Sequence, residues 1–350
     1  MALDEDAMRS DADETDAATE AQGAKPVDAG GSVARDVIAV VVAFDPDAAA
    51  LRRLLERLVP QIGHTILVDN SERPEVSERI ATAAADAHVE LLAIGHNSGI
   101  ARAHNVGVAR AIERGARYVL LSDDDSVPAT DMVARLLEGL RSAPEPMQGA
   151  AAQVVDGSGK GRVAAVGPRV FDAREPSSTL VFRDTLFGPR RAALAPGERE
   201  PLEVAFLVAS GCLIDVDAWR AVGPLREDLF IDHVDLEWGV RARRAGWSLF
   251  AIGDAQLEHR LGDHVLRPWF LGGRRVHVHS PARNYFLARN TLLLVRGTLL
   301  PAGWRLGYLI WLAKYAAFNA LFVAPRALRL KMFARALAHG LSGRSGALNR

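Results

Sequence analysis

Three consecutive aspartates, Asp123, Asp124 and Asp125, follow an apolar stretch in this 350-residue sequence. Their charges repel one another, so ionising all three together is costly unless solvent or a cation offsets the repulsion. Carboxylate oxygens suit Mg²⁺ or Mn²⁺, which can bridge the oxygens of a diphosphate and stabilise the charge that develops as it departs. The alternative is a turn that caps the next helix through Asp125 or Ser126. A cap accounts for one acid, and the cluster therefore favours a divalent metal site.

Alternating strands and helices must position this cluster. Residues 37–44 form a continuous, β-branched apolar run, which is typical of a strand buried on both faces of a parallel sheet. Similar patterns predict strands at residues 65–68, 89–94 and 118–121, a helix that Asp47 caps and that reaches Leu58, and a helix at residues 101–114. This alternation predicts a βαβ sheet with right-handed crossovers.

Polar turns lie at the carboxyl ends of three of these predicted strands, where an open α/β sheet binds a nucleotide. They are Phe44-Asp45, Asp69-Asn70 and the aspartate cluster itself. None of them contains a glycine-rich phosphate loop, which argues against a dinucleotide fingerprint or a P-loop.

The second half of the chain is less regular. Residues 143–201 are rich in Gly, Pro, Ala and Arg, and we expect a loop-rich cover of the site with one strand at residues 163–171. Residues 204–214 are strand-like, and helices are predicted at residues 217–222 and from Asp232 to Gly246. The three-residue spacing of Asp232 and Asp235 at a helix start lets both face one cleft.

The two ends of the chain differ in charge. The first 30 residues carry nine acids against two basic residues, which predicts a disordered acidic arm. That arm has no apolar run after a basic start, so it does not predict a secretory signal peptide, and we expect a cytoplasmic location. No Asp or Glu follows Asp263, whereas fourteen Lys and Arg do. A single cysteine, Cys212, excludes an intramolecular disulfide and a cysteine-cluster zinc site.

Residues 306–324 are nineteen mostly apolar residues at the lower limit for crossing a bilayer, but they include Lys314 and Asn319. A helix docked on the core is a second interpretation. We favour a third, a helix lying on an anionic membrane surface, because basic residues alternate with apolar ones just beyond: Arg326, Arg329, Lys331 and Arg335.

Eight motifs occur in a characteristic order along the chain. They are VVAF at 41–44, VDN at 68–70, NSGIARAHNVG at 97–107, SDDDS at 122–126, SGCLI at 210–214, FIDHVDLEW at 230–238, HRLGD at 259–263 and HSPARNYFLARN at 279–290. With these motifs the sequence resembles the inverting GT-A glycosyltransferases of family 2, and more narrowly their bacterial rhamnosyltransferase branch, over nearly all of residues 37–346. The resemblance implies an α/β nucleotide-diphospho-sugar transferase fold, with a Rossmann-like mixed sheet flanked by helices and with C-terminal basic helices.

The resemblance assigns the acidic residues to two tasks. The family's Asp-x-Asp motif matches Asp123 and Asp125, whereas Asp124 departs from the usual Gln of the branch and is grouped with the donor-binding residues. The position of the general base matches Asp235, three residues before Trp238, and leaves Asp232 to orient the acceptor or the base. The alternative for these helix-start acids, Glu237 included, is a capping box with a solvated face.

The resemblance also implies further ligands. His259 corresponds to a residue that can help to hold the metal, although a lone histidine can be structural and His279 competes for the role. The residues assigned to the nucleotide sugar are Phe44, Asp69, Asn70, Asn97, Gly99, Arg102, Asp123, Asp124, Ser210, Gly211, Arg283 and Arg289. Asp69 and Asn70 have an Asx-turn as their alternative, Arg102 a helix-surface charge, and the two later arginines a lipid contact.

The expected activity is metal-dependent inverting transfer of L-rhamnose from dTDP-L-rhamnose to a cell-surface polysaccharide or a lipid-linked glycan, at the inner face of the cell membrane. Alternatives are a galactofuranosyl- or hexosyltransferase of the same fold, or a non-catalytic glycan- or lipid-binding protein. No motif supports nucleic-acid binding. We expect the acidic arm at residues 1–36, a catalytic domain at 37–290 with a nucleotide-binding half at 37–142 and an acceptor half at 143–290, and a basic membrane-associating tail at 291–350.

Overall fold

The computed structural model describes residues 33–144, 162–259, 264–266 and 276–348. Nearly all of the predicted acidic arm lies outside the described residues, as do residues 260–263 of the HRLGD motif. The described residues belong to one compact unit that begins at Ser32.

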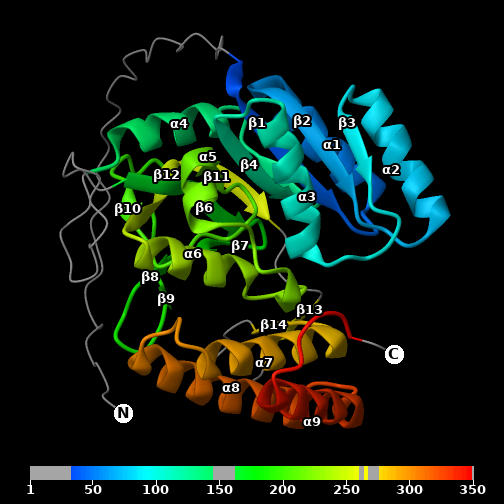
Figure 1. Cartoon of the computed structure of the whole chain (residues 1–350), viewed down its shortest axis with the longest axis vertical. Helices are drawn as coiled ribbons and strands as arrows, with labels where there is room; N and C mark the ends of the chain where they lie inside the picture. The colour runs from blue at the N-terminus through cyan, green and yellow to red at the C-terminus, as the bar shows by residue number, and fades with distance from the viewer. Residues whose placement is uncertain (1–32, 145–161, 260–263, 267–275, 349–350) are drawn as a thin grey trace, which may run out of the picture. The chain divides into compact units, whose positions relative to one another are not determined.

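Four parallel strands form the first half of a mixed sheet (Figure 1). They are β1 (Ala34–Ala43), β2 (Ile62–Asp69), β3 (Glu90–Ala93) and β4 (Tyr118–Asp123). In this sheet β1 lies between β2 and β4, with Ala43 opposite Asp69 and Val42 opposite Asp123. Because parallel strands end at the same edge, this register brings the three polar turns together, as the sequence pattern predicts.

The second half of the sheet is mixed, in the order β10-β12-β6-β11-β4. Its strands are β5 (Ser126–Pro128), β6 (Arg162–Asp172), β7 (Glu175–Thr179), β10 (Leu202–Glu203), β11 (Leu213–Asp215) and β12 (Trp247–His259). Strand β11 runs antiparallel to both β4 and β6. A two-stranded hairpin, β8 (Phe182–Arg183) with β9 (Arg190–Arg191), stands apart from the sheet.

The prediction of a strand over residues 204–214 is largely wrong, because only its last two residues belong to β11. The chain turns sharply before them. Gly211 has a φ of +82°, and its N–H donates to the carbonyl of Leu121 at 2.8 Å. A side chain disfavours this left-handed conformation, so the glycine permits the turn that ends beside the aspartate cluster.

Helices cover both faces of the sheet because β1 is apolar on both. Its residues Val37, Ala39, Val41 and Ala43 pack with α1, α2 and α4, whereas Ile38, Val40 and Val42 pack with α3, α5 and α6. The helices are α1 (Ala48–Leu58), α2 (Pro74–Asp86), α3 (Ile100–Glu113), α4 (Met132–Ser142), α5 (Val216–Val222) and α6 (Val234–Arg244), with short 3₁₀ turns at Val59–Gln61 and Glu227–Leu229.

The start of α6 corrects the sequence prediction. The helix begins at Val234, so Asp232 lies before it and not on its first turn. Phe230, Asp232 and His233 all have positive φ angles, of 67°, 64° and 62°. Such backbone is costly for residues other than glycine and clusters at functional sites.

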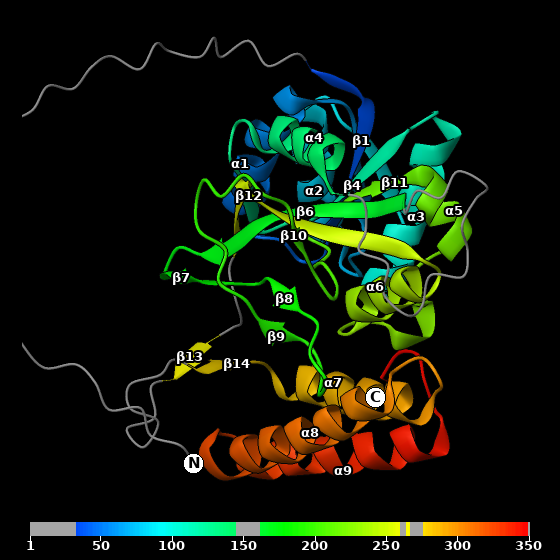
Figure 2. The ribbon, with the colours of Figure 1, turned by 90° about the vertical axis from the view of Figure 1, so that its left-hand side faces the viewer.

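Three helices follow the sheet and form a separate layer: α7 (Pro281–Arg296), α8 (Ala302–Phe322) and α9 (Arg326–Ser342) (Figure 2). A small hairpin of β13 (His264–Leu266) and β14 (Val276–Val278) precedes them. The predicted boundary between a catalytic domain and a tail at residue 290 falls inside α7, which continues unbroken.

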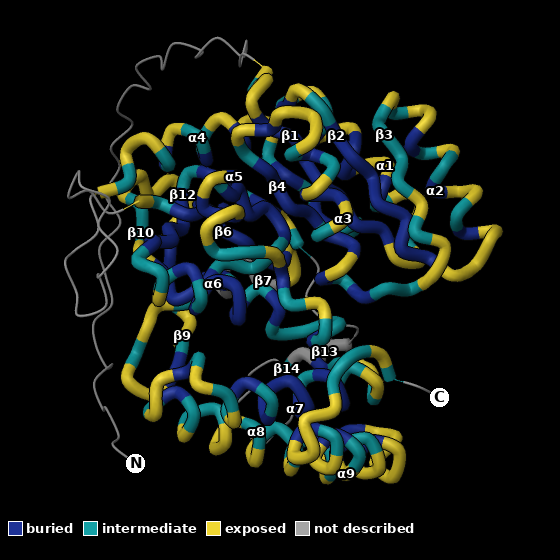
Figure 3. The backbone as a smooth tube through the Cα atoms, in the orientation of Figure 1, coloured by how far each residue is buried: buried dark blue, intermediate teal, exposed yellow. Residues whose placement is uncertain are grey.

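Exposed residues recur along the outer sides of α8 and α9 (Figure 3). Helix α8 covers most of the predicted segment at residues 306–324. Within the described residues, no helix is both long enough and apolar enough to cross a membrane.

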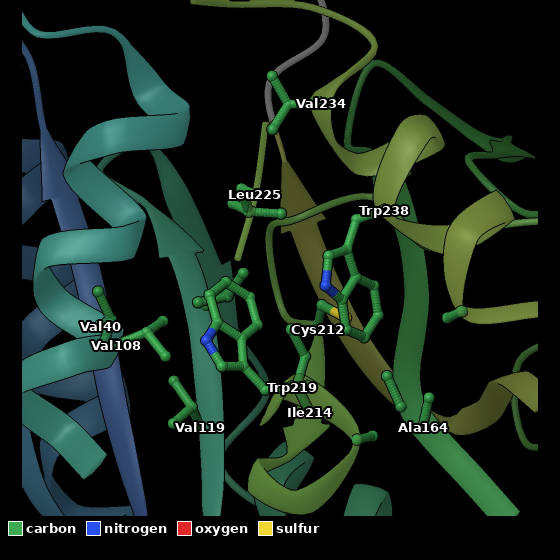
Figure 4. Packing of buried hydrophobic residues seen from close by; sticks show 14 of the residues in the cluster. Val40, Val108, Val119, Ala164, Cys212, Ile214, Trp219, Leu225, Val234 and Trp238 are labelled. Atoms are coloured by element: carbon green, nitrogen blue, oxygen red, sulfur yellow. The ribbon is translucent and has the colours of Figure 1, made fainter. Parts of the chain in front are cut away.

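Two tryptophans fix the helix that carries Asp235. Trp219 of α5 and Trp238 of α6 stack with centroids 5.9 Å apart, within the apolar cluster that also buries Cys212 (Figure 4). The indole N–H of Trp238 donates to the carbonyl of Gly223 at 2.9 Å. The buried indole therefore sets both the depth and the rotation of α6.

Candidate active site

The carboxyl edge of the parallel strands opens into a cavity of about 740 Å³. Its walls come from the strand-end turns, the β8–β9 hairpin, the loop before α6, and α8. Small-molecule sites of proteins have this size and position.

The aspartate cluster lines one side of this cavity. The Asp124 carboxylate accepts the Phe44 N–H at 2.9 Å, and the Asp123 N–H donates to Ser210 Oγ at 3.0 Å. The pKa of Asp124 is raised to about 7. Burial is the main cause, the charges of Asp125 and Asp123 act in the same direction, and the hydrogen bond from the Phe44 amide opposes them. Asp124 therefore holds the β1 turn, while Asp123 and Asp125 keep about a third and two fifths of their side chains exposed.

His259 meets the cluster from the end of β12. Its Nδ1 lies 3.2 Å from Asp125 Oδ1 and 3.0 Å from Ser126 Oγ. Burial lowers its pKa, but the hydrogen bond and charge of Asp125 outweigh burial, and the pKa is raised. The carboxylates and imidazole suit a divalent cation chemically. In the part of the chain that the structure describes, however, no three His, Cys, Asp or Glu side chains already stand as a metal cluster.

His104 joins the site without having been predicted. It is buried on α3, with Nε2 3.9 Å from Asp123 Oδ1, and neither ring nitrogen has a hydrogen-bond partner among the described residues. Burial lowers its pKa to about 4, so the ring is neutral at pH 7. The available signal was a polar residue at a helical core position, since Ala101, Val108 and Ala111 are buried on the same side.

Two acids near the start of α6 face the cavity in different states. Asp232 Oδ1 accepts two hydrogen bonds from Arg283, at 3.0 and 3.2 Å, while its buried Oδ2 has no partner among the described residues. Asp235 is partly buried and accepts the Leu236 N–H at 2.8 Å. Burial raises its pKa to about 6, helped by the charges of Asp232 and Asp123. Glu237 instead pairs with Arg241 at 2.9 Å.

The turns after β2 and β3 are joined by amide side chains. Asn70 Oδ1 accepts hydrogen bonds from the N–H and Oγ of Ser98, at 2.9 and 2.8 Å. Asn97 Oδ1 accepts the Gly99 N–H at 3.1 Å. Gly99 has a φ of +84°, and a Cβ there would lie 2.6 Å from the carbonyl oxygen of Phe230. Phe44, half exposed, lines the same side of the cavity.

Four residues assigned to the nucleotide sugar lie outside the cavity lining. Asp69 is buried and accepts the Ser71 N–H, as the Asx-turn alternative requires. Arg102 is exposed on α3, where its guanidinium lies 3.4 Å from the Glu227 carboxylate. Gly211 has a positive φ and forms the turn before β11.

Arg289 is the fourth, and the structure places it away from the cavity lining. It is fully buried and donates to the carbonyl of Leu229 at 2.9 Å and to Asn290 Oδ1. A guanidinium that satisfies buried carbonyls in this way cannot also bind a phosphate in the cavity.

Comparisons with known proteins show what this chain is similar to. Residues 38–179 match the family model described as Glycosyl transferase family 2. The dTDP-rhamnosyl transferase RfbF of Shigella flexneri is 26% identical over 266 residues, which cover 76% of this chain and 82% of that protein.

Solved structures resemble this one in fold. TarS 1-349 from S. aureus, in complex with UDP-GlcNAc, has a TM-score of 0.52 at 12% identity, covering 88% of this chain and 81% of its own. GalNAc-T7 with UDP, GalNAc and Mn²⁺ has a TM-score of 0.51 at 12% identity. The match covers 84% of this chain and 58% of GalNAc-T7. The predicted α/β GT-A fold is confirmed.

Proposed function

We propose that the chain is a glycosyltransferase of family 2 that transfers L-rhamnose from dTDP-L-rhamnose, with inversion, to a cell-surface polysaccharide or a lipid-linked glycan. The name of the Shigella relative supports the donor sugar and its nucleotide. One observation carries the chemistry. A partly buried carboxyl, Asp235, with its pKa raised to about 6, lies in the same cavity as Asp123 and Asp125.

Asp235 is the general base of the proposed reaction. Inverting transfer passes through an oxocarbenium-like state in which one carboxylate takes the proton from the attacking hydroxyl. A base works best when its pKa lies near the operating pH, and burial provides this for Asp235. Asp232, held by Arg283, orients the base or the acceptor.

Asp123, Asp125 and His259 are the proposed holders of a divalent cation. An ion bound there supplies charge stabilisation for the departing diphosphate. Mn²⁺ accompanies UDP in the similar structure of GalNAc-T7, which supports this assignment.

The donor side is assigned to the strand-end turns. Phe44 supplies an exposed ring for the nucleobase, and Asn70 and Asn97 shape the edge beside it. Arg283 lines the cavity next to Asp232, where its planar guanidinium suits an anionic oxygen of the donor.

We assign the outer side of α8 and α9 to an anionic membrane surface. Large apolar residues are exposed there: Leu306, Leu309, Ile310, Leu321, Leu328, Leu330, Leu337 and Leu341. Lys314, Arg326 and Lys331 are exposed among them, and no acid occurs after Asp263. An apolar helix face mixed with basic residues suits the interface of an anionic bilayer.

Transfer and donor hydrolysis measured across a panel of nucleotide sugars test the activity. The panel includes dTDP-L-rhamnose, UDP-galactofuranose, UDP-glucose and GDP-mannose, each with Mn²⁺. We expect turnover with dTDP-L-rhamnose and a loss of about 10²- to 10⁴-fold in Asp235→Asn with dTDP binding retained.

The matched control is Asp86→Asn, which removes an exposed carboxylate at the end of α2 and should leave turnover unchanged. If the enzyme prefers another nucleotide sugar, that compound is the donor and dTDP-L-rhamnose is not. Protein that binds glycan yet turns over no donor would contradict the catalytic proposal.

A further inference from the structure

Helix α8 forms one wall of the cavity that holds Asp235. Gly307, Tyr308 and Trp311 line it, although they lie more than 70 residues beyond Asp235 in the sequence. None of the sequence motifs includes them. This wall is aromatic, whereas the donor side of the cavity is built from carboxylates and amides.

The aromatic rings of this wall are held in place. The His233 ring stands edge-on to Tyr308, with centroids 5.7 Å apart, and to Trp311 at 6.3 Å. Its Nε2 lies 2.9 Å from Thr291 Oγ1 of α7. Trp311 stacks on Tyr315 at 4.9 Å and remains 38% exposed. One face of the indole is therefore covered by protein, and the residue still lines the cavity.

The β8–β9 hairpin is fastened to the same helix. The indole N–H of Trp304 donates to Asp184 Oδ1 at 3.0 Å and to the Thr185 carbonyl at 2.9 Å. Gly307 allows the hairpin to approach, because a Cβ there would lie 1.8 Å from the Phe187 carbonyl oxygen. This contact sets Phe187, half exposed, into the cavity lining beside Trp311.

Tyr308 lines the same cavity as the proposed base, Asp235. Burial raises the pKa of its phenol, and the charge of Asp235 raises it further, so the hydroxyl stays protonated beside the carboxylate. Within the described residues the hydroxyl makes no hydrogen bond. It is therefore a donor available to a ligand next to Asp235.

We propose that Tyr308 and Trp311 form an acceptor subsite for a saccharide ring, with the indole against the apolar face of the ring and the phenol bonded to a hydroxyl beside the one that Asp235 deprotonates. The assignment rests on the proposed function, because it takes the acceptor to be a sugar. Ordered aromatic rings with a few convergent polar groups are typical of such sites. An apolar lipid chain could not form a hydrogen bond with the phenol of Tyr308.

Acceptor kinetics test the subsite. Methyl and octyl glycosides of glucose, galactose, rhamnose and N-acetylglucosamine serve as acceptors with dTDP-L-rhamnose and Mn²⁺. We expect Trp311→Ala and Tyr308→Phe to raise the acceptor KM about five- to tenfold, with donor KM and donor hydrolysis without acceptor unchanged. The matched control is Phe322→Ala, an exposed aromatic of α8 that does not line the cavity. An equal rise in donor KM, or an unchanged acceptor KM, overturns the proposal.

A binding measurement keeps the test independent of turnover. Wild type and Trp311→Phe, each holding dTDP and Mn²⁺, are titrated with the same glycosides while tryptophan fluorescence is recorded. A saturable fluorescence change that is present in the wild type and absent in Trp311→Phe supports the subsite. If the same protein turns over no donor, that failure contradicts the proposed function and leaves the subsite supported. No saturable change with any glycoside, the same change in the variant, or binding of octyl but not methyl glycosides overturns it.

Discussion

At the scale of single residues, two neighbouring aspartates, Asp232 before α6 and Asp235 on its first turn, acquire different properties from their surroundings. Asp232 is held by Arg283 at 3.0 Å, whereas Asp235 is partly withdrawn from solvent and has no cationic partner among the described residues. The pKa of Asp235 rises to about 6 for that reason. Environments that separate the behaviour of neighbouring carboxyls are how active sites divide acid and base roles.

The pH dependence of turnover tests this difference. Asp235 must be deprotonated to act as a base, so kcat/KM should rise with pH and level off above about 6. Stability should respond in the opposite sense. The folded-state pKa lies above the ordinary value of 3.8, so the contribution of Asp235 to stability is lost as pH rises through about 6.

The measurements are a pH profile of kcat/KM and urea unfolding across the same range, with Asp235→Asn as comparison. Unfolding of the variant should lack this component of the pH dependence. A wild-type profile that is flat from pH 5 to pH 7 would count against Asp235 as the base.

At the scale of elements, the loops at the strand ends are fitted closely to one another. Gly99 begins α3, and a Cβ there would lie 2.6 Å from the Phe230 carbonyl oxygen. The positive φ angles at residues 230, 232 and 233 belong to the loop that this contact supports. The backbone that aims Asp232 into the cavity therefore depends on the absence of a side chain at residue 99.

Substitution of Gly99 should lower the free energy of unfolding by more than the strain of its positive φ alone would. Gly99→Ala carries a left-handed φ of +84° and a clash, whereas Gly95→Ala has a φ of +80° and nothing within 4 Å. We expect about 1–2 kcal/mol lost in Gly95→Ala and at least about 1 kcal/mol more in Gly99→Ala. Urea unfolding measures the loss of stability in each variant. Equal losses would show that the loop at Phe230 moves away from the added methyl group at no cost in free energy.

At the scale of the whole molecule, charge is unevenly distributed along the chain. No acid follows Asp263, and exposed leucines share the outer side of α8 and α9 with Lys314, Arg326 and Lys331. Tyr308 and Trp311 of α8 line the cavity. One helix thus connects the proposed membrane surface with the proposed acceptor subsite.

Vesicle binding tests the surface. Changing Lys314, Arg326 and Lys331 to Gln should weaken binding to phosphatidylserine-containing vesicles by about 3 kcal/mol, roughly a hundredfold. The control removes three exposed arginines from α1, Arg52, Arg53 and Arg57. Equal weakening in both triple variants would assign the attraction to charge in general, and equal binding to neutral vesicles would show that anionic lipid does not drive it.

Ligand-linked stability tests the divided site. Mn²⁺ with dTDP at about one hundred times Kd should stabilise the wild type by about 2.7 kcal/mol, visible as a raised Tm. Asp125→Asn should lose most of this gain, while Asp131→Asn, an exposed acid at the start of α4, should keep it. A Tm indifferent to Mn²⁺ in the presence of dTDP would contradict metal binding at the cluster.

The sequence by itself determined the parallel strands and the meeting of their polar ends. Val37 to Ala43 are apolar on both faces, so the strand had to be central, and strand ends align wherever strands run parallel. The same local signals located the aspartate cluster and the helix behind Asp235.

Only the tertiary structure decided which polar residues reach the cavity. Arg289 and Arg283 lie on the same helix, yet one is buried under backbone carbonyls and the other faces Asp232. His104 and Tyr308 join the site through helix packing across long sequence separations. Local patterns encode burial and secondary structure, whereas the direction of a side chain depends on the distant elements that pack around it.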